Sequence, residues 1–219
     1  AIATGPGSYF ISLITAWFLN ELSPRARSIV TFIFYAPSIS GNAMLVWTLA
    51  FSGDSYGYVN GWLMKLGIIS EPILWFTNTK YIMPLCIVVS LWMSLGTSFL
   101  AFIAGFQGIN HDMYEAAAID GIKNRWQELW YVTLPSMKPQ LMFGAVMAIT
   151  GAFNFGGVVE SLAGNPTTDY CAYTLTMHLN EYSGVRWEVG YASAIAFIMF
   201  LLMFGSNMLI HKLLSKVGQ

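Results

Sequence analysis

Five stretches of this 219-residue chain contain no Asp, Glu, Lys or Arg over roughly the 20 residues that a membrane-spanning helix needs. They are Ala1–Asn20, Ser28–Gly53, Tyr81–Asn110, Pro139–Val159 and Val189–Ile210. A central Asp, Lys or Arg costs about 2.5–3.5 kcal/mol on insertion, whereas each Leu, Ile, Phe or Val contributes about 0.3–0.6 kcal/mol. The stretches therefore predict an all-α polytopic membrane protein with spans at 1–20, 28–52, 81–106, 139–159 and 189–211.

Composition agrees with this class. The chain is 56% hydrophobic and 10% charged, with a mean hydropathy of +0.57, whereas a soluble domain carries about 25% charged residues. We expect one domain over 1–219, with further residues upstream, because the chain starts at Ala1 without a basic flank. The net charge of −1 indicates no nucleic-acid partner, and the positions of Cys86 and Cys171 predict neither a disulfide nor a metal site.

Two of the stretches contain residues that disturb helices. Gly5, Pro6 and Gly7 make the first stretch the weakest candidate, and it could be the end of a longer helix. Pro37 lies inside the second stretch, where it predicts a kink.

Five spans would divide the basic residues unequally between the two sides of the membrane. One side would hold Arg25, Arg27, Lys123, Arg125, Lys138, Lys212 and Lys216. The other would hold Lys65, Lys80 and Arg186. Because cytoplasmic loops are enriched in Lys and Arg, residues 107–138 and the C-terminus are predicted to be cytoplasmic, and the loops near 54–80 and 160–188 to face outward.

The 107–138 segment is predicted to begin with a short helix. Asp112 and Glu115 have the spacing of a capping box. The alanine-rich run from Glu115 to Ile119 favours a helix, and Gly121 suits the left-handed position that ends one.

A second helix is predicted directly afterwards. Asn124 and Gln127 indicate its start, and we expect it to run over Arg125–Thr133 and to stop before Pro135. The result is a helix–turn–helix on the cytoplasmic face.

This element is suited to transmit the movement of a bound partner to the membrane spans. Three small side chains, Ala116–Ala118, allow a partner to approach closely, and Trp126, Leu129 and Trp130 can anchor the second helix to the ends of the spans. Movement of a bound soluble partner would then reach the spans as a rigid-body displacement.

The loop resembles a known family. Its pattern is Glu-Ala-Ala-x-x-Asp-Gly followed by Thr-Leu-Pro, carried by Glu115, Ala116, Ala117, Asp120, Gly121, Thr133, Leu134 and Pro135. It is similar to the EAA loop of binding-protein-dependent ABC importer permeases. Further similarity to the carbohydrate type of maltose and glycerol-phosphate systems, and to its F-type subunit, lies in Gly57–Asn60, Gly164–Pro166 and Gly190–Ala194. That family usually has six or more spans, so the resemblance implies a helix upstream of Ala1.

The resemblance implies a type I ABC importer transmembrane domain in the cytoplasmic membrane of a bacterium or archaeon. It would form half of the pathway for a sugar or oligosaccharide. Its partners would be a second permease, two ATPase subunits and an extracytoplasmic solute-binding protein. The chain would be non-catalytic and without cofactor or metal, with ATP and magnesium on the ATPase, because it has no Gly-x-x-x-x-Gly-Lys-Ser/Thr loop. The ATPase contact would be made by Glu115, Ala116, Ala117, Asp120 and Gly121.

Polar residues inside two of the spans are candidates for the solute site, since hydrocarbon tolerates few of them. They are Ser90, Ser94, Thr97, Thr150, Phe153 and Asn154. The resemblance implies that all six fall where maltose-type permeases line their site. Phe153 and Asn154 also match in residue type, whereas the serines and Thr97 do not.

Other interpretations stay open. Hydroxyl side chains also pack between membrane helices, Asn154 could bond to a neighbouring helix, and Glu115 could serve as a helix cap alone. The solute could be a phosphate ester or an amino acid. A secondary transporter would need charges inside the spans, and a membrane enzyme would need clustered His, Asp or Glu; neither pattern is present in the sequence.

Overall fold

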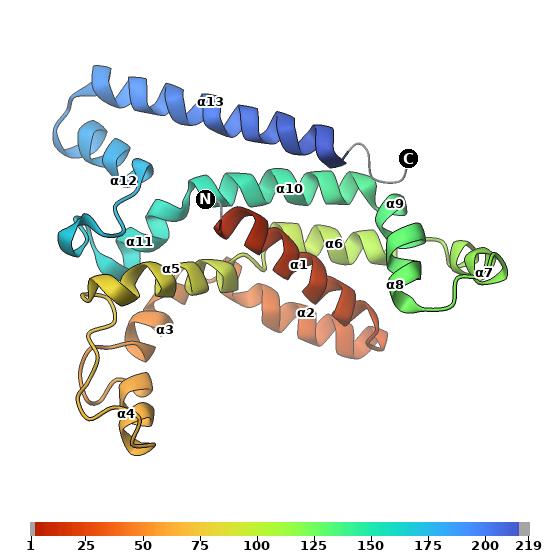
Figure 1. Cartoon of the computed structure of the whole chain (residues 1–219), viewed down its shortest axis with the longest axis horizontal. Coiled ribbons are helices and arrows are strands. Elements are labelled where there is room, and N and C mark those ends of the chain that lie inside the picture. Colours follow the sequence, from red (N-terminus) through yellow and green to blue (C-terminus); the bar gives the residue numbers. More distant parts are fainter. Residues whose placement is uncertain (1–2, 215–219) are drawn as a thin grey trace.

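The computed structural model describes residues 3–214, and within this range the regular structure is helical throughout. The long helices run roughly along one axis of the molecule (Figure 1). The elements are α1 (Thr4–Asn20), α2 (Pro24–Ile39), α3 (Ala43–Ala50), α4 (Tyr58–Lys65), α5 (Thr79–Met93), α6 (Thr97–Gln107), α7 (His111–Ile119), α8 (Arg125–Glu128), the π-helical turn η1 (Leu129–Thr133), α9 (Leu134–Ser136), α10 (Lys138–Phe153), α11 (Phe155–Ala163), the 3₁₀ turn η2 (Thr168–Tyr170), α12 (Leu175–Asn180), the π-helical turn η3 (Glu181–Val185) and α13 (Val189–Leu214).

The predicted spans are mostly bent. In the described part of the chain, α13 alone is long and apolar enough to cross a membrane as a single helix. Up to four crossings result if each bent pair counts as one: α2–α3 (86°), α5–α6 (41°) and α10–α11 (41°). The first predicted span is α1, whose 17 residues extend about 25 Å, less than the roughly 30 Å hydrocarbon core.

The bend in the second stretch lies close to the predicted position. Helix α2 continues through Pro37 and ends at Ile39, and α3 starts at Ala43 after a near right-angle turn. Pro37 lacks the N–H that would donate to the carbonyl of Ile33, which weakens the last turn of α2. The kink is therefore confirmed, but the chain turns three residues later than Pro37.

Helix α1 packs against α6 and α10 to form one apolar core cluster. Phe102 of α6 is fully buried, and its ring lies directly over Gly144 of α10. A Cβ atom at Gly144 would lie 2.3 Å from Cζ of Phe102, so this close approach requires glycine. A second cluster joins α5, α11 and α12 around Ile82, Val89 and Val159.

The connecting segments gather at the two ends of the long axis. Helices α7, α8 and α9 lie at one end, together with the α1–α2 turn and the end of α13. Helices α4 and α12 lie at the opposite end (Figure 1). Residues 107–138 are thus separated from the 54–80 and 160–188 segments by the length of the helices.

Candidate functional site

The first arm of the 107–138 element is longer than the sequence suggested. Helix α7 starts at His111, because the side chain of Asn110 accepts a hydrogen bond from the backbone N–H of Asp112 at 3.2 Å. The predicted capping box of Asp112 and Glu115 is therefore wrong. Glu115 instead lies 3.4 Å from the His111 ring one turn earlier, and both side chains are exposed.

Gly121 ends this arm as predicted. Its φ of +95° is in the left-handed region. The N–H of Gly121 donates to the carbonyl of Ala118, and the N–H of Ile122 donates to the carbonyl of Ala117 at 3.0 Å. This pair of bonds is the Schellman motif, which glycine adopts without the steric cost of a Cβ atom.

The second arm starts as predicted but ends differently. The Asn124 side chain accepts from the N–H of Gln127 at 2.9 Å, which confirms this start. The predicted stop before Pro135 is wrong, because the helix widens into η1 and continues as α9. Pro135 has no N–H for a normal helical bond. The wider turn accommodates it, with the N–H of Leu134 donating five residues back to Leu129.

The two arms form one unit with an open face. The hydroxyl groups of Tyr114 and Thr133 lie 3.2 Å apart, and burial is the main cause that raises the pKa of Tyr114. Ala117 is the buried residue of the first arm. The exposed residues of this arm and its turn are His111, Asp112, Met113, Glu115, Ala116, Ala118, Ile119, Asp120 and Gly121.

A cavity of about 310 Å³, with seven hydroxyl residues in its lining, lies where the three bent pairs break. Ser38 precedes the α2–α3 turn, Ser94 and Gly96 lie in the α5–α6 break, and Gly151 and Val158 flank the α10–α11 break. The other lining residues are Thr4, Ser8, Ser90, Met93, Thr97, Ser98, Met147, Ala148 and Ala152. Irregular backbone at membrane depth is tolerated where it lines such a cavity.

The structure brings half of the predicted solute residues to this cavity. Ser90, Ser94 and Thr97 line it. They do so around the break between α5 and α6, and not along one continuous helix. The side chains of Thr150, Phe153 and Asn154 are not among the lining residues.

Thr150 and Asn154 nevertheless lie close to this lining along the chain. Each comes three residues after a lining residue of α10, namely Met147 and Gly151 respectively. Asn154 is exposed at the end of α10. Phe153 is tied to α12, since its carbonyl accepts from the hydroxyl of Thr176 at 2.8 Å.

The sequence interpretation missed four hydroxyl residues of the cavity, which are Thr4, Ser8, Ser38 and Ser98. A signal existed for two of them, because Thr4, Ser8 and Ser12 recur every four residues and so share one face of α1. Ser12 is fully buried and donates to the carbonyl of Ser94 at 3.3 Å.

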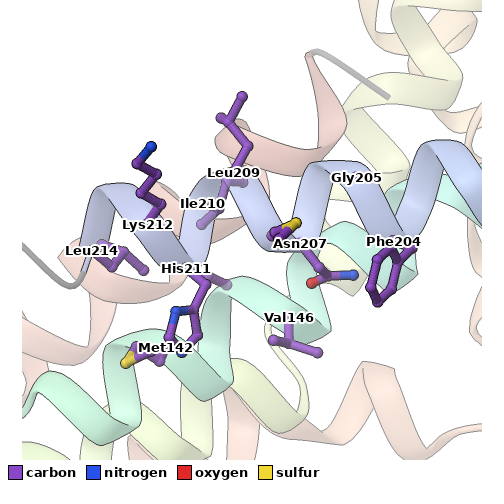
Figure 2. Close-up of a pocket in the computed structure, with 12 residues that line it drawn as sticks. Met142, Val146, Phe204, Gly205, Asn207, Leu209, Ile210, His211, Lys212 and Leu214 are labelled. Carbon is purple, nitrogen blue, oxygen red and sulfur yellow. The ribbon is translucent and has the colours of Figure 1, made fainter.

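A different cavity, of about 800 Å³, lies between α10 and the last turns of α13. Figure 2 shows Asn207 and His211 pointing toward α10, where Met142 and Val146 lie. Its lining is mostly apolar, so it suits a polyhydroxylated solute less well than the cavity at the helix breaks.

These features define a bundle of bent, apolar helices of membrane-spanning type with an exposed helix–turn–helix at one end. Residues 8–218 match the family described as the binding-protein-dependent transport system inner membrane component. The chain therefore belongs to this family of ABC transporter subunits.

Three permease proteins are among the relatives of this chain. The chain is 31% identical over 198 residues to the probable ABC transporter permease protein YesP of Bacillus subtilis, covering 88% of this chain and 62% of the relative. It is 28% identical to the arabinooligosaccharide permease AraP of the same species, covering 88% and 61%. It is 27% identical to the lactose permease LacF of Rhizobium radiobacter, covering 88% and 65%. The chain thus spans less than two thirds of the length of these relatives.

Solved structures confirm the predicted ABC importer permease fold. One is a bacterial ABC transporter involved in the import of the acidic polysaccharide alginate, with a TM-score of 0.79 at 21% identity over 100% of this chain and 80% of that one. Another is the alginate transporter in complex with a periplasmic protein that holds an alginate pentasaccharide, with a TM-score of 0.76 at 22% identity over 98% and 73%.

Proposed function

We propose that this chain is a non-catalytic permease subunit of an ATP-driven importer and forms half of a translocation pathway for a sugar or oligosaccharide. The observation that carries the proposal is the exposed helix–turn–helix at one end of the bundle, with Gly121 in a Schellman turn. A folded element of this kind offers a soluble ATPase a rigid surface to move.

The ATPase would dock on the open face of the first arm. Glu115, Ala116, Asp120 and Gly121 are exposed there, and small side chains leave room for a close approach. Ala117 is buried, so its contribution is to let the first arm pack closely on the second.

The solute would pass the cavity at the helix breaks. The lining residues named above include seven hydroxyl side chains and no charged one, which suits an uncharged polyhydroxylated solute. Thr150 and Asn154, each three residues after a lining residue, would extend this wall along α10 and add hydrogen-bonding groups, while Phe153 would offer an aromatic face. The names of the arabinooligosaccharide permease AraP and the lactose permease LacF, which concern sugars, support the same solute class.

A phosphate ester or an amino acid is the competing solute. Each carries charge, and burial of an unpaired charge is costly. The described lining of the cavity provides no counter-charge. We therefore favour the neutral sugar.

The complete importer would contain a second permease, two ATPase subunits that hold ATP and magnesium, and an extracytoplasmic solute-binding protein. The 107–138 element and the C-terminus would lie in the cytoplasm, as the basic residues indicate. The segments around α4 and α12, at the opposite end of the bundle (Figure 1), would meet the binding protein.

The test is co-expression of the full-length protein with the products of neighbouring genes, followed by assay of binding-protein-stimulated ATP hydrolysis. The wild type is compared with a Glu115→Lys, Gly121→Leu double variant. Loss of the ATPase subunit or of the stimulation in the variant supports the proposal. Normal assembly and stimulation in the variant would show that this surface does not receive the ATPase.

A further inference from the structure

An ion pair connects the helix–turn–helix to the end of α1. Nη2 of Arg125, at the start of α8, lies 2.9 Å from a carboxylate oxygen of Glu21, although the two residues are 104 positions apart. Nη1 of the same guanidinium donates to Glu128 at 3.0 Å. Arg125 is thus held between one carboxylate of its own helix and one of α1.

A ring contact lies next to this ion pair. Trp126 follows Arg125 on α8, and Trp17 precedes Glu21 by one helical turn on α1. The two indole rings have centroids 5.0 Å apart and an interplanar angle of 54°. Two adjacent residues of the loop therefore hold two consecutive turns of α1.

The end of α1 that receives these contacts is itself fixed. Arg27 of α2 donates to the backbone carbonyls of Asn20 and Leu22, both at 3.2 Å. A cavity of about 480 Å³ separates the surrounding parts of the loop from this corner. The ion pair and the ring contact therefore cross this cavity and join the loop to the end of α1 that Arg27 holds in place.

The other half of α1 lies at the solute cavity. Thr4 and Ser8 line that cavity, and the buried hydroxyl of Ser12 donates to the carbonyl of Ser94 in the α5–α6 break. Along its 17 residues, α1 thus contacts the loop at one end and the cavity at the other. Figure 1 shows α1 running from near the middle of the long axis to the end that carries α7 and α8.

We propose that α1 is the lever through which the 107–138 element acts on the solute cavity, with Glu21–Arg125 and Trp17–Trp126 as its driving contacts. The proposal rests on the function proposed above. An α-helix of this length moves as a stiff body, so a displacement of α8 is transmitted to Ser8 and Ser12 and changes the α5–α6 break.

The test uses the full-length protein assembled with its partner subunits in proteoliposomes. The quantity measured is the ratio of binding-protein-stimulated to basal ATP hydrolysis. Glu21→Arg brings like charges together, and we expect it to lower this ratio about fivefold, as does Arg125→Glu. The Glu21→Arg, Arg125→Glu charge swap should bring the ratio back to within about twofold of wild type. Glu21→Gln removes the charge with little change in shape, and we expect a smaller loss.

The matched control is Arg25→Glu, a charge reversal like Arg125→Glu on an exposed residue at the start of α2, at the same end of the bundle. A second readout reports on the cavity itself, namely the rate at which a Ser8→Cys variant reacts with a small thiol reagent with and without ATP. We expect ATP to change this rate in the Ser8→Cys protein, and Glu21→Arg to remove the difference.

The inference would be overturned if the complex containing Glu21→Arg kept the wild-type ratio, or if the charge swap were no better than either single reversal. These outcomes differ from failure of the proposed function, in which the wild-type chain would neither retain ATPase subunits nor support stimulated hydrolysis.

Discussion

The hydroxyl groups of Tyr114 and Thr133 lie 3.2 Å apart and join the first arm of the helix–turn–helix to the second. Thr133 also donates to the carbonyl of Glu128 at 3.2 Å, across the widened turn η1. The contact therefore connects α7 to the element that passes Pro135. Because the arms are joined, a force on the exposed face of α7 reaches the second arm directly.

Removing this contact should loosen the loop without unfolding the bundle. Tyr114→Phe deletes one hydrogen bond, whose net contribution is about 0.5–1.5 kcal/mol. We expect faster amide hydrogen exchange over residues 111–133 and little change elsewhere, measured by mass spectrometry on the assembled complex. Tyr131→Phe is the control, because the Tyr131 side chain is largely exposed. Equal exchange in the two variants would contradict this role of Tyr114.

Gly121 should be sensitive to substitution because of its backbone conformation and not because a side chain would clash with neighbouring atoms. A Cβ atom there would meet nothing within 4 Å, yet φ is +95°. Gly121→Ala should therefore destabilise the turn by about 1 kcal/mol and reduce retention of the ATPase subunit during purification. Gly184→Ala is the control, since Gly184 has equally open surroundings without a positive φ. Unchanged retention in Gly121→Ala would show that the left-handed turn is dispensable.

Alanine substitutions at two glycines of α10 should change the stability of the protein in opposite directions. Gly144→Ala forces a Cβ atom into the ring of buried Phe102 and should destabilise the protein by about 1–3 kcal/mol. Gly151→Ala meets nothing within 4 Å and should stabilise the helix by about 0.5–1 kcal/mol. Thermal unfolding of the purified complex measures both. Adding Phe102→Leu to Gly144→Ala should recover part of the loss, and no recovery would argue against this packing.

Asn60 should control the order of the segment around α4. Its side chain is fully buried. It donates to the carbonyls of Ser52, Asp54 and Ile73, and it accepts from Ile73 N–H and from the Trp75 indole at 2.9 Å.

Asn60→Ala leaves these buried groups without partners, at about 1–3 kcal/mol for each one that water does not reach. We expect rapid proteolysis within residues 52–77 of the variant. Trp75→Phe removes a single bond of the set and should give an intermediate rate. Protease resistance equal to wild type in Asn60→Ala would show that the segment is ordered by other contacts.

The stability of the segment before α13 should depend on pH. A hydrogen bond from Tyr173 and one from Arg186 lower the pKa of Glu181 below its ordinary value of 4.5. A lowered carboxyl pKa stabilises the fold above the unfolded-state value, and this stability is lost as pH falls through the folded-state value. Glu181→Gln should therefore lower the melting temperature at pH 7 and make less difference near pH 4. A difference that is the same at both pH values would contradict this assignment.

Much of the helix–turn–helix could be predicted because its signals are local. Gly121 and Asn124 determine a turn and a cap through their own backbone and side chain. The capping prediction at Asp112 failed because Asn110, two residues earlier, caps the helix instead. The stop before Pro135 failed because a π-helical turn can accommodate a proline that a regular helix would not.

The cavity at the helix breaks was only partly predictable because it depends on packing between distant segments. Ser90, Ser94 and Thr97 were identified as polar residues within a span. Their arrangement follows from the break at Gly96, where the backbone lies against Ser38 of another helix. No spacing within one stretch reveals that contact.

The most direct test of the account is site-specific cross-linking from α7 to the ATPase. Ala118 is exposed on α7, whereas native Cys86 is buried and Cys171 lies near α12 at the other end of the bundle. The full-length Ala118→Cys protein, assembled with its partner subunits, is treated with a short thiol-to-amine cross-linker. The account predicts a cross-linked product with the ATPase subunit that is absent from the wild type and from a Ser55→Cys control at the opposite end. No such product from Ala118→Cys, or an equal yield from Ser55→Cys, would contradict it.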